Sequence, residues 1–130
     1  MPITLGQRSL TRLQGVHPDL VRVVKRAAAI SHIDFTVLEG LRTQADQARL
    51  MRLGATRTLN SRHLTGHAVD IAPMVGGTVR WDWPLYRQLA EIIKSAAAEE
   101  KVPVTWGGDW KTFKDGPHWE LPWKQYPKGK

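Results

Sequence analysis

A run of ten residues, 61–70, holds the side chains of this sequence that are best suited to bind a metal. It reads Ser-Arg-His-Leu-Thr-Gly-His-Ala-Val-Asp, and an apolar segment follows it directly. If a strand begins within this run, side chains alternate between its faces, so Asp70 shares a face with small alanines while His67 points the other way. Gly66 can supply the bend that returns His63 toward Asp70. The spacing therefore predicts His63 and Asp70, and not His67, as metal ligands.

A third ligand must come from elsewhere, because a catalytic zinc usually takes three protein ligands and leaves one position for water. His118 is well placed, since it lies at a predicted turn-to-strand junction with acidic residues on both sides. The chain has no cysteine, so nitrogen and oxygen must hold any metal. The site also needs a base for the proton of the water, and Asp115 and Glu120 are both candidates. Spacing alone leaves a simpler interpretation open, in which His118 is a surface residue and Asp70 caps a strand.

The hydrophobic pattern predicts the elements that must position these residues. Helices are expected to end near residues 13, 30, 53 and 100, and strands are expected over 34–38, 68–72, 78–81, 102–106 and 118–121. Residues 55–60 are expected to form a loop. Helices and strands in this order, with hairpin-type turns, indicate an α+β fold: a mainly antiparallel sheet flanked by helices. We expect one domain over residues 1–130, with an irregular tail after about residue 121.

Local signals add detail to the first two helices. Ser9 or Thr11 is expected to cap the first helix, and Pro18 fits the first turn of the second. His17 is expected to lie in a loop or to cap that second helix, and His32 is expected on the surface. Neither histidine is predicted to be a metal ligand.

The net charge of +7 and the sequence pI of about 10.1 favour polyanionic surroundings, such as nucleic acid, anionic lipid or a cell wall. The same charge could simply aid solubility. The basic residues are scattered, and no dense block resembles a nucleic-acid-binding tail. No apolar run approaches the roughly 20 residues that a membrane helix needs. The first residues do not resemble a secretory signal, so we expect synthesis in the cytoplasm.

The motif Ser61-x-His63-x-x-Gly66-x-Ala68-x-Asp70, followed by Asp115-x-x-His118, resembles the zinc peptidases of the D-alanyl-D-alanine carboxypeptidase and VanY type. Among these, it is most similar to phage endolysins that act as L-alanyl-D-glutamate peptidases. The resemblance extends to residues 37–43 and to the helix that begins at Pro18, and so covers nearly the whole chain. It implies the small α+β fold that these peptidases share with Hedgehog signalling domains.

The resemblance also implies roles for individual residues. His63, Asp70 and His118 match the zinc ligands, and Asp115 matches the general base, where the carboxypeptidases more often carry glutamate. Arg42 matches an arginine placed to contact substrate or the developing oxyanion, a role that suits a fixed cation.

Two further contacts are expected near the site. Ser61 is expected to hydrogen-bond either the substrate or a residue that supports the ligands. Trp106, Trp110 and Trp119 flank the predicted site and could form a wall of its cleft, although core packing is the usual place for tryptophan. Of these three, Trp119 is expected to bind substrate.

These expectations describe a monomeric, zinc-dependent endolysin that cuts the L-alanyl-D-glutamate bond of peptidoglycan stem peptides for host lysis. It would stay in the host cytoplasm until a holin-type pore gave it access to the wall, and it would not bind nucleic acid. Three alternatives remain open: a D-Ala-D-Ala carboxypeptidase with the same zinc site, a non-catalytic Hedgehog-like wall-binding module, and a small basic nucleic-acid-binding protein. The last does not explain the placement of His63, Asp70 and His118.

Overall fold

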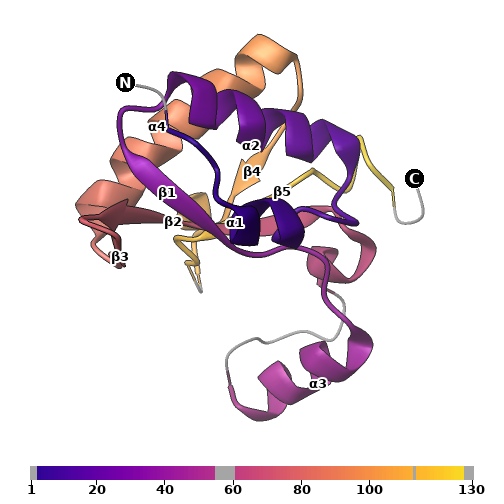
Figure 1. Ribbon diagram of the computed structural model, residues 1–130. Helices are drawn as coiled ribbons and strands as arrows, with labels where there is room; N and C mark the ends of the chain where they lie inside the picture. Colours follow the sequence, from indigo (N-terminus) through magenta and orange to yellow (C-terminus); the bar gives the residue numbers. More distant parts are fainter. Residues whose placement is uncertain (1–2, 55–60, 113, 128–130) are drawn as a thin grey trace.

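A computed structural model describes residues 3–54, 61–112 and 114–127 (Figure 1). Within these residues the helices are α1 (Gln7–Arg12), α2 (Pro18–Ile30), α3 (Gln44–Arg52) and α4 (Trp83–Glu100), with short 3-10 helices η1 (Arg62–Thr65) and η2 (Gly107–Asp109). The strands are β1 (Asp34–Glu39), β2 (Ala68–Val75), β3 (Thr78–Val79), β4 (Thr105–Trp106) and β5 (His118–Glu120). The loop expected over 55–60 lies outside the described residues.

The strands form one antiparallel sheet in the order β1-β2-β5-β4, with β3 paired to β2 as a short hairpin. Helices α2 and α4 lie side by side against the sheet, whereas α3 projects away from the body of the domain (Figure 1). The predicted α+β fold with a mainly antiparallel sheet is therefore confirmed. None of the helices in the described part of the chain is long and apolar enough to span a membrane.

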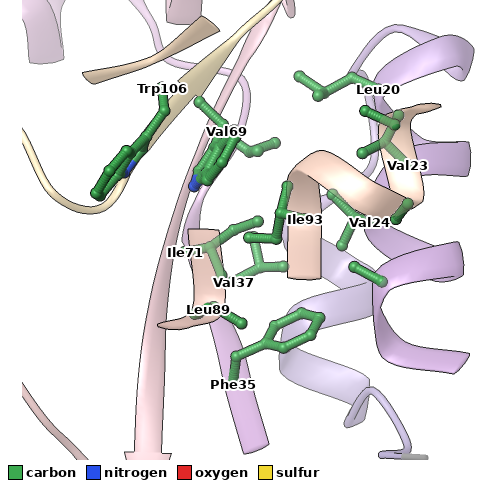
Figure 2. Packing of buried hydrophobic residues seen from close by; sticks show 14 of the residues in the cluster. Leu20, Val23, Val24, Phe35, Val37, Val69, Ile71, Leu89, Ile93 and Trp106 are labelled. Atoms are coloured by element: carbon green, nitrogen blue, oxygen red, sulfur yellow. The ribbon is translucent and has the colours of Figure 1, made fainter. Parts of the chain in front are cut away.

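The core lies between the sheet and the pair α2 and α4. Val69 and Ile71 of β2 point toward Ile93 of α4 and Val24 of α2, with Val37 of β1 beside them (Figure 2). All five side chains are at most 1% exposed. Burial of an aliphatic side chain of this size contributes about 1.5–3 kcal/mol. The alternation along β2 thus puts its odd-numbered residues here in the core and turns Asp70 to the opposite face.

The helix starts agree with the sequence at α2 and differ at α1. His17 occupies the N-cap of α2, where its Nδ1 accepts the Asp19 backbone N–H at 3.1 Å, and Pro18 opens the helix. Helix α1 begins earlier than expected, at Gln7, and neither Ser9 nor Thr11 caps it. Ser9 is instead buried, and its Oγ accepts the backbone N–H of β1 residue Val37 at 3.0 Å. The prediction that Ser9 caps α1 is wrong, because its hydrogen-bond partner is a strand distant in sequence.

The tail after Leu121 has no helix or strand as far as residue 127, yet it is held in place. The buried guanidinium of Arg62 donates to the carbonyl of Leu121 at 2.8 Å and to that of Tyr126 at 2.7 Å. The Tyr126 hydroxyl donates to Asp19 at 2.6 Å. The bonds from Arg62 thus join the tail to η1, the helix that carries His63, and the bond to Asp19 joins it to α2.

Candidate active site

His63, Asp70 and His118 meet on the face of the sheet opposite the core. Their ligand atoms all lie within 4.8 Å of one another. Asp70 Oδ1 is 3.2 Å from His63 Nε2 and 3.4 Å from His118 Nδ1. Asp70 and His118 are direct partners across the antiparallel pair β2 and β5, so their side chains share a face. The structure brings together the three residues that the spacing predicted as ligands.

Helix η1 and the residue that follows strand β1 hold His63 in position. Ser61 caps η1, and its Oγ accepts the His63 backbone N–H at 3.2 Å. The ring Nδ1 lies 2.8 Å from the carbonyl of Gly40, so Nδ1–H donates there and Nε2 keeps its lone pair for a metal. Gly66 ends η1 with a φ of 76°, and an added Cβ would collide with the Gly15 carbonyl oxygen. Of the two roles expected for Ser61, the structure shows a hydrogen bond to the backbone of a candidate ligand, His63.

Glu120 fixes the other histidine. Its Oε1 lies 2.7 Å from His118 Nε2, so that nitrogen donates to the carboxylate and Nδ1 faces Asp70. The two residues share a face of β5, as the sequence predicted. Since Glu120 orients the ring of a candidate ligand, its position favours Asp115 over Glu120 as the base.

Charge at this site suits a cation. Burial opposes the charged form of Asp70, but hydrogen bonds with His118 and His63 outweigh it and hold the pKa of Asp70 well below its usual range. Burial lowers the pKa of His118, but Asp70 and Glu120 outweigh this effect and raise it to about 9. The two carboxylates on either side of the His118 ring create a strongly negative environment, which favours a positive charge. The donor set of two imidazoles and a carboxylate therefore fits a divalent metal such as zinc.

Asp115 lies beside this group in the loop before β5. Its carbonyl accepts the His118 backbone N–H at 3.2 Å, and its own N–H donates to the carbonyl of Gly107 at 3.1 Å. A Cβ on Gly107 would lie only 3.0 Å from that of His118, so glycine permits this close approach. Burial, and then the negative charge of Asp70, raise the pKa of Asp115. A carboxyl group with a raised pKa is better matched to proton transfer near neutral pH.

The side chain of Arg42 approaches Asp70 from the start of α3. Its Nη2 lies 3.8 Å from Asp70 Oδ2, Nη1 donates to Gln47 Oε1 at 2.7 Å, and Nε pairs with Glu39. Its backbone N–H donates to the carbonyl of His63 at 2.9 Å. Sequence reasoning missed Gln47, a fully buried amide on a mostly exposed helix. A glutamine on an exposed helix does not indicate burial, and its hydrogen bond to Arg42 depends on the tertiary fold.

The tryptophans divide between the two faces of β5. The Trp110 ring lies 5.1 Å from that of His118, in agreement with a wall beside the site. Trp119 is 2% exposed and stacks on Trp106 in the core, with ring centroids 5.9 Å apart. This burial contradicts the prediction that Trp119 contacts substrate. The reason is alternation, because the residue after His118 must point to the opposite face.

Comparison with known proteins agrees with this geometry. Residues 1–121 match the family model described as phage L-alanyl-D-glutamate peptidase. The L-alanyl-D-glutamate peptidase of Escherichia phage T5 is 31% identical over 119 residues, which cover 88% of this chain and 87% of that protein. The peptidoglycan L-alanyl-D-glutamate endopeptidase CwlK of Bacillus subtilis is 33% identical over 117 residues, with 75% of this chain and 66% of that protein covered.

The crystal structure of the Serratia marcescens L-Ala D-Glu endopeptidase ChiX is also similar. It superposes with a TM-score of 0.88 and 51% sequence identity, over 93% of this chain and 91% of that one. The match of the family model to nearly the whole chain and the similarity to these relatives show that this chain belongs to the phage L-alanyl-D-glutamate peptidase family.

Proposed function

We propose that this protein is a zinc-dependent endopeptidase that hydrolyses the L-alanyl-D-glutamate bond of peptidoglycan stem peptides. The observation that carries the proposal is the convergence of His63, Asp70 and His118 beside a buried carboxyl group, Asp115. Relatives from a phage and from two bacteria are all named for this bond. A peptide amide is also a suitable target for a site with a cation position and an adjacent base.

The metal would be held by His63 Nε2, Asp70 Oδ1 and His118 Nδ1. In each histidine the other ring nitrogen is already hydrogen-bonded, in His63 to the Gly40 carbonyl and in His118 to Glu120. The two remaining ring nitrogens therefore face Asp70. Bound zinc would supply a Lewis acid that polarises the peptide carbonyl and makes water a better nucleophile at neutral pH.

Asp115 is proposed to move the proton. Its carboxylate would accept a proton from the attacking water and return it to the nitrogen of the departing D-glutamate. Its raised pKa makes it a stronger base than an exposed aspartate. The loop bonds to Gly107 and His118 would hold the carboxyl group in one position during this transfer.

Arg42 is proposed to stabilise the negative charge that develops on the carbonyl oxygen. Glu39 and Gln47 fix the guanidinium, so its position is set before substrate binds. Ser61 is proposed to act indirectly, through its hydrogen bond to the backbone of His63.

Mass spectrometry of digested peptidoglycan tests the proposal. We expect stem peptides with a new N-terminal D-glutamate, loss of activity after chelation, and recovery when zinc is added. Release of free D-alanine would indicate the carboxypeptidase alternative. Binding to peptidoglycan without any new product would indicate a non-catalytic module.

Host lysis by a monomer forms the last part of the proposal, and the phage origin of one relative is consistent with the role in lysis. The expected route to the wall is a holin-type pore. Expression in bacteria with and without a co-expressed holin tests this route, and we expect lysis only with the holin. Sedimentation of the purified protein at a single monomer mass tests the oligomeric state.

A further inference from the structure

A hollow lies at the β4 edge of the sheet, between α4 and η2. Its volume of about 560 Å³ is within the range of small-molecule sites. Trp83, Arg87, Glu91 and Lys94 supply one side and form a single stripe along α4, at spacings of four, four and three residues. Trp106, Gly108, Asp109 and Lys114 supply the other side.

Two indole rings form a corner inside this pocket. The Trp83 and Trp106 ring centroids lie 6.3 Å apart at an interplanar angle of 58°. Trp83 is 37% exposed although it is a large aromatic residue, whereas Trp106 is nearly buried. The negative face of an aromatic ring attracts the C–H bonds that line one side of a pyranose ring. An exposed indole face in a pocket therefore suits a sugar.

Charges of both signs surround these rings. Lys94 pairs with Asp109 at 2.8 Å and lies 5.4 Å above the Trp106 ring, and Arg87 lies 5.8 Å from that of Trp83. Glu91 adds a second carboxylate. These carboxylates would repel a small anion. An apolar helix docked here would bury the charged groups, which costs free energy. A neutral ligand with many hydroxyl and acetamido groups can use the donors and the acceptors together.

The pocket, on the α4 side of the sheet, and the candidate active site both adjoin the short helix η2. A Cβ on Gly107 would lie 3.1 Å from the Asp115 Cβ and 3.0 Å from the His118 Cβ, while the next residue along η2 lines the pocket. Consecutive Cα atoms are about 3.8 Å apart, so a single step along the backbone separates the glycine that touches the site from the glycine that lines the pocket. The Trp106 indole N–H donates to the carbonyl of Gly116, in the loop between Asp115 and His118, at 2.7 Å.

The proposed substrate carries its sugars close to the cleaved bond. In peptidoglycan the L-alanine of the stem peptide is joined to the lactyl group of muramic acid, so one residue and one short linker separate the sugar from the cleaved bond. Each such unit extends about 3.5 Å, which places the sugar about 7 Å from that bond. We propose that the pocket between Trp83 and Trp106 binds an N-acetylated amino sugar of the glycan strand. This inference rests on the proposed function, since it assigns the group next to the cleaved bond.

A comparison of two substrates tests the inference. The first is a disaccharide-tetrapeptide, and the second is the same tetrapeptide without its sugars. We expect the wild-type holoenzyme to favour the first by about tenfold or more in kcat/KM. Trp83→Ala and, more mildly, Glu91→Ala should reduce this ratio severalfold, mainly through KM for the glycosylated substrate.

Matched controls are available on the same segment. Trp81→Ala removes an indole that is 60% exposed and outside the pocket, and Gln88→Ala changes an exposed residue on another side of α4. Both should leave the substrate ratio unchanged. A wild-type ratio near one, or a ratio that Trp83→Ala and Glu91→Ala both leave intact, would overturn the inference.

A binding measurement separates this inference from the proposed function. The peptide-free disaccharide N-acetylglucosaminyl-N-acetylmuramic acid is titrated into the holoenzyme while the indole N–H signals are followed by NMR. We expect the Trp83 signal to shift in the wild type, and we expect weaker binding in Glu91→Ala. Failure to cleave either peptide would refute the proposed function alone, whereas absence of any shift at Trp83 would refute the sugar site.

Discussion

Two regions of the molecule each bring two histidine rings and an aspartate together, yet only one is arranged to hold a metal. The metal cluster consists of His63, Asp70 and His118, and its two rings lie 5.1 Å apart. The capping cluster consists of His17, His67, Asp19 and Tyr126, and its two histidine rings lie 5.5 Å apart. The clusters are similar in composition and ring spacing, so the difference must lie in the direction of the polar atoms.

In the metal cluster, each outer ring nitrogen is bonded away from the centre and each inner nitrogen points to Asp70. In the capping cluster, the polar atoms serve the backbone and the tail. His17 Nδ1 accepts the Asp19 backbone N–H, His67 Nδ1 lies 2.6 Å from Thr65 Oγ1, and the Asp19 carboxylate bonds Arg22 and Tyr126. Proximity of histidine and aspartate is thus insufficient for a metal site, because the free lone pairs must also converge.

The largest effect should follow from removal of a ligand. His118→Ala takes away one of three donors and the partner of Asp70, so we expect bound zinc and hydrolysis both to be lost. His17→Ala removes a ring of the capping cluster and should retain stoichiometric zinc. Metal analysis of the two purified variants, with circular dichroism as a check of folding, makes the comparison. Equal zinc in both proteins would contradict the assignment of the metal cluster.

Replacement of the proposed base should separate catalysis from metal binding. Asp115→Asn keeps the size of the side chain and removes its ability to accept a proton, so kcat should fall by about 10²- to 10⁴-fold. Zinc content should not change, because Asp115 supplies none of the converging donors. Glu100→Gln, at the C-terminal end of α4, is a matched control with the same change of charge. Full activity of Asp115→Asn would assign the proton transfer to another group.

A smaller effect is expected from the residue that orients His118. Glu120→Gln preserves the shape but replaces the charged acceptor of the ring N–H by a neutral amide. Loss of such a supporting carboxylate typically weakens metal binding by about 10- to 100-fold. Competition with a chromogenic zinc chelator measures the change. An unchanged zinc affinity would show that the charge of Glu120 does not contribute to metal binding by His118.

Much of the metal cluster could be predicted from sequence because alternation along a strand is a local rule. That rule places Asp70 and rejects His67, and the turn before β5 suggests His118. The same rule, applied one residue further, would also have placed Trp119 in the core. The partnership of Asp70 with His118 needs the register of β2 and β5, which the spacing did not contain.

The supporting contacts could not be predicted, since they join segments far apart in the chain. The His63 ring donates a hydrogen bond to the carbonyl of Gly40, and the Arg42 guanidinium donates one to Gln47 of a mostly exposed helix. The sequence predicts Ser9 as a candidate helix cap, whereas its hydroxyl group accepts a hydrogen bond from the backbone of β1. Short polar side chains fit both local and long-range roles, so their identity alone does not distinguish the two.

The smallest effect should come from the capping cluster, where Tyr126 joins the tail to α2. Its hydrogen bond is the main cause that lowers the pKa of Asp19, against a smaller opposing effect of burial. A carboxyl group with a lowered folded pKa stabilises the fold above its unfolded pKa, and this contribution disappears as the pH falls through the folded value. Tyr126→Phe should therefore cost about 1 kcal/mol near pH 7 and lower Tm by about 3–6 °C.

The same substitution should matter less in acid. Once Asp19 is protonated in both states, the charged form that Tyr126 favours no longer contributes, so the gap in Tm between Tyr126→Phe and wild type should narrow toward pH 3. Calorimetry at pH 7 and pH 3 measures this gap, and zinc affinity at pH 7 should stay unchanged because the tyrosine lies in the capping cluster. A gap that is equal at both values would show that the hydroxyl group acts independently of the charge on Asp19, because Tyr126→Phe keeps the ring that packs on His17, 5.2 Å away.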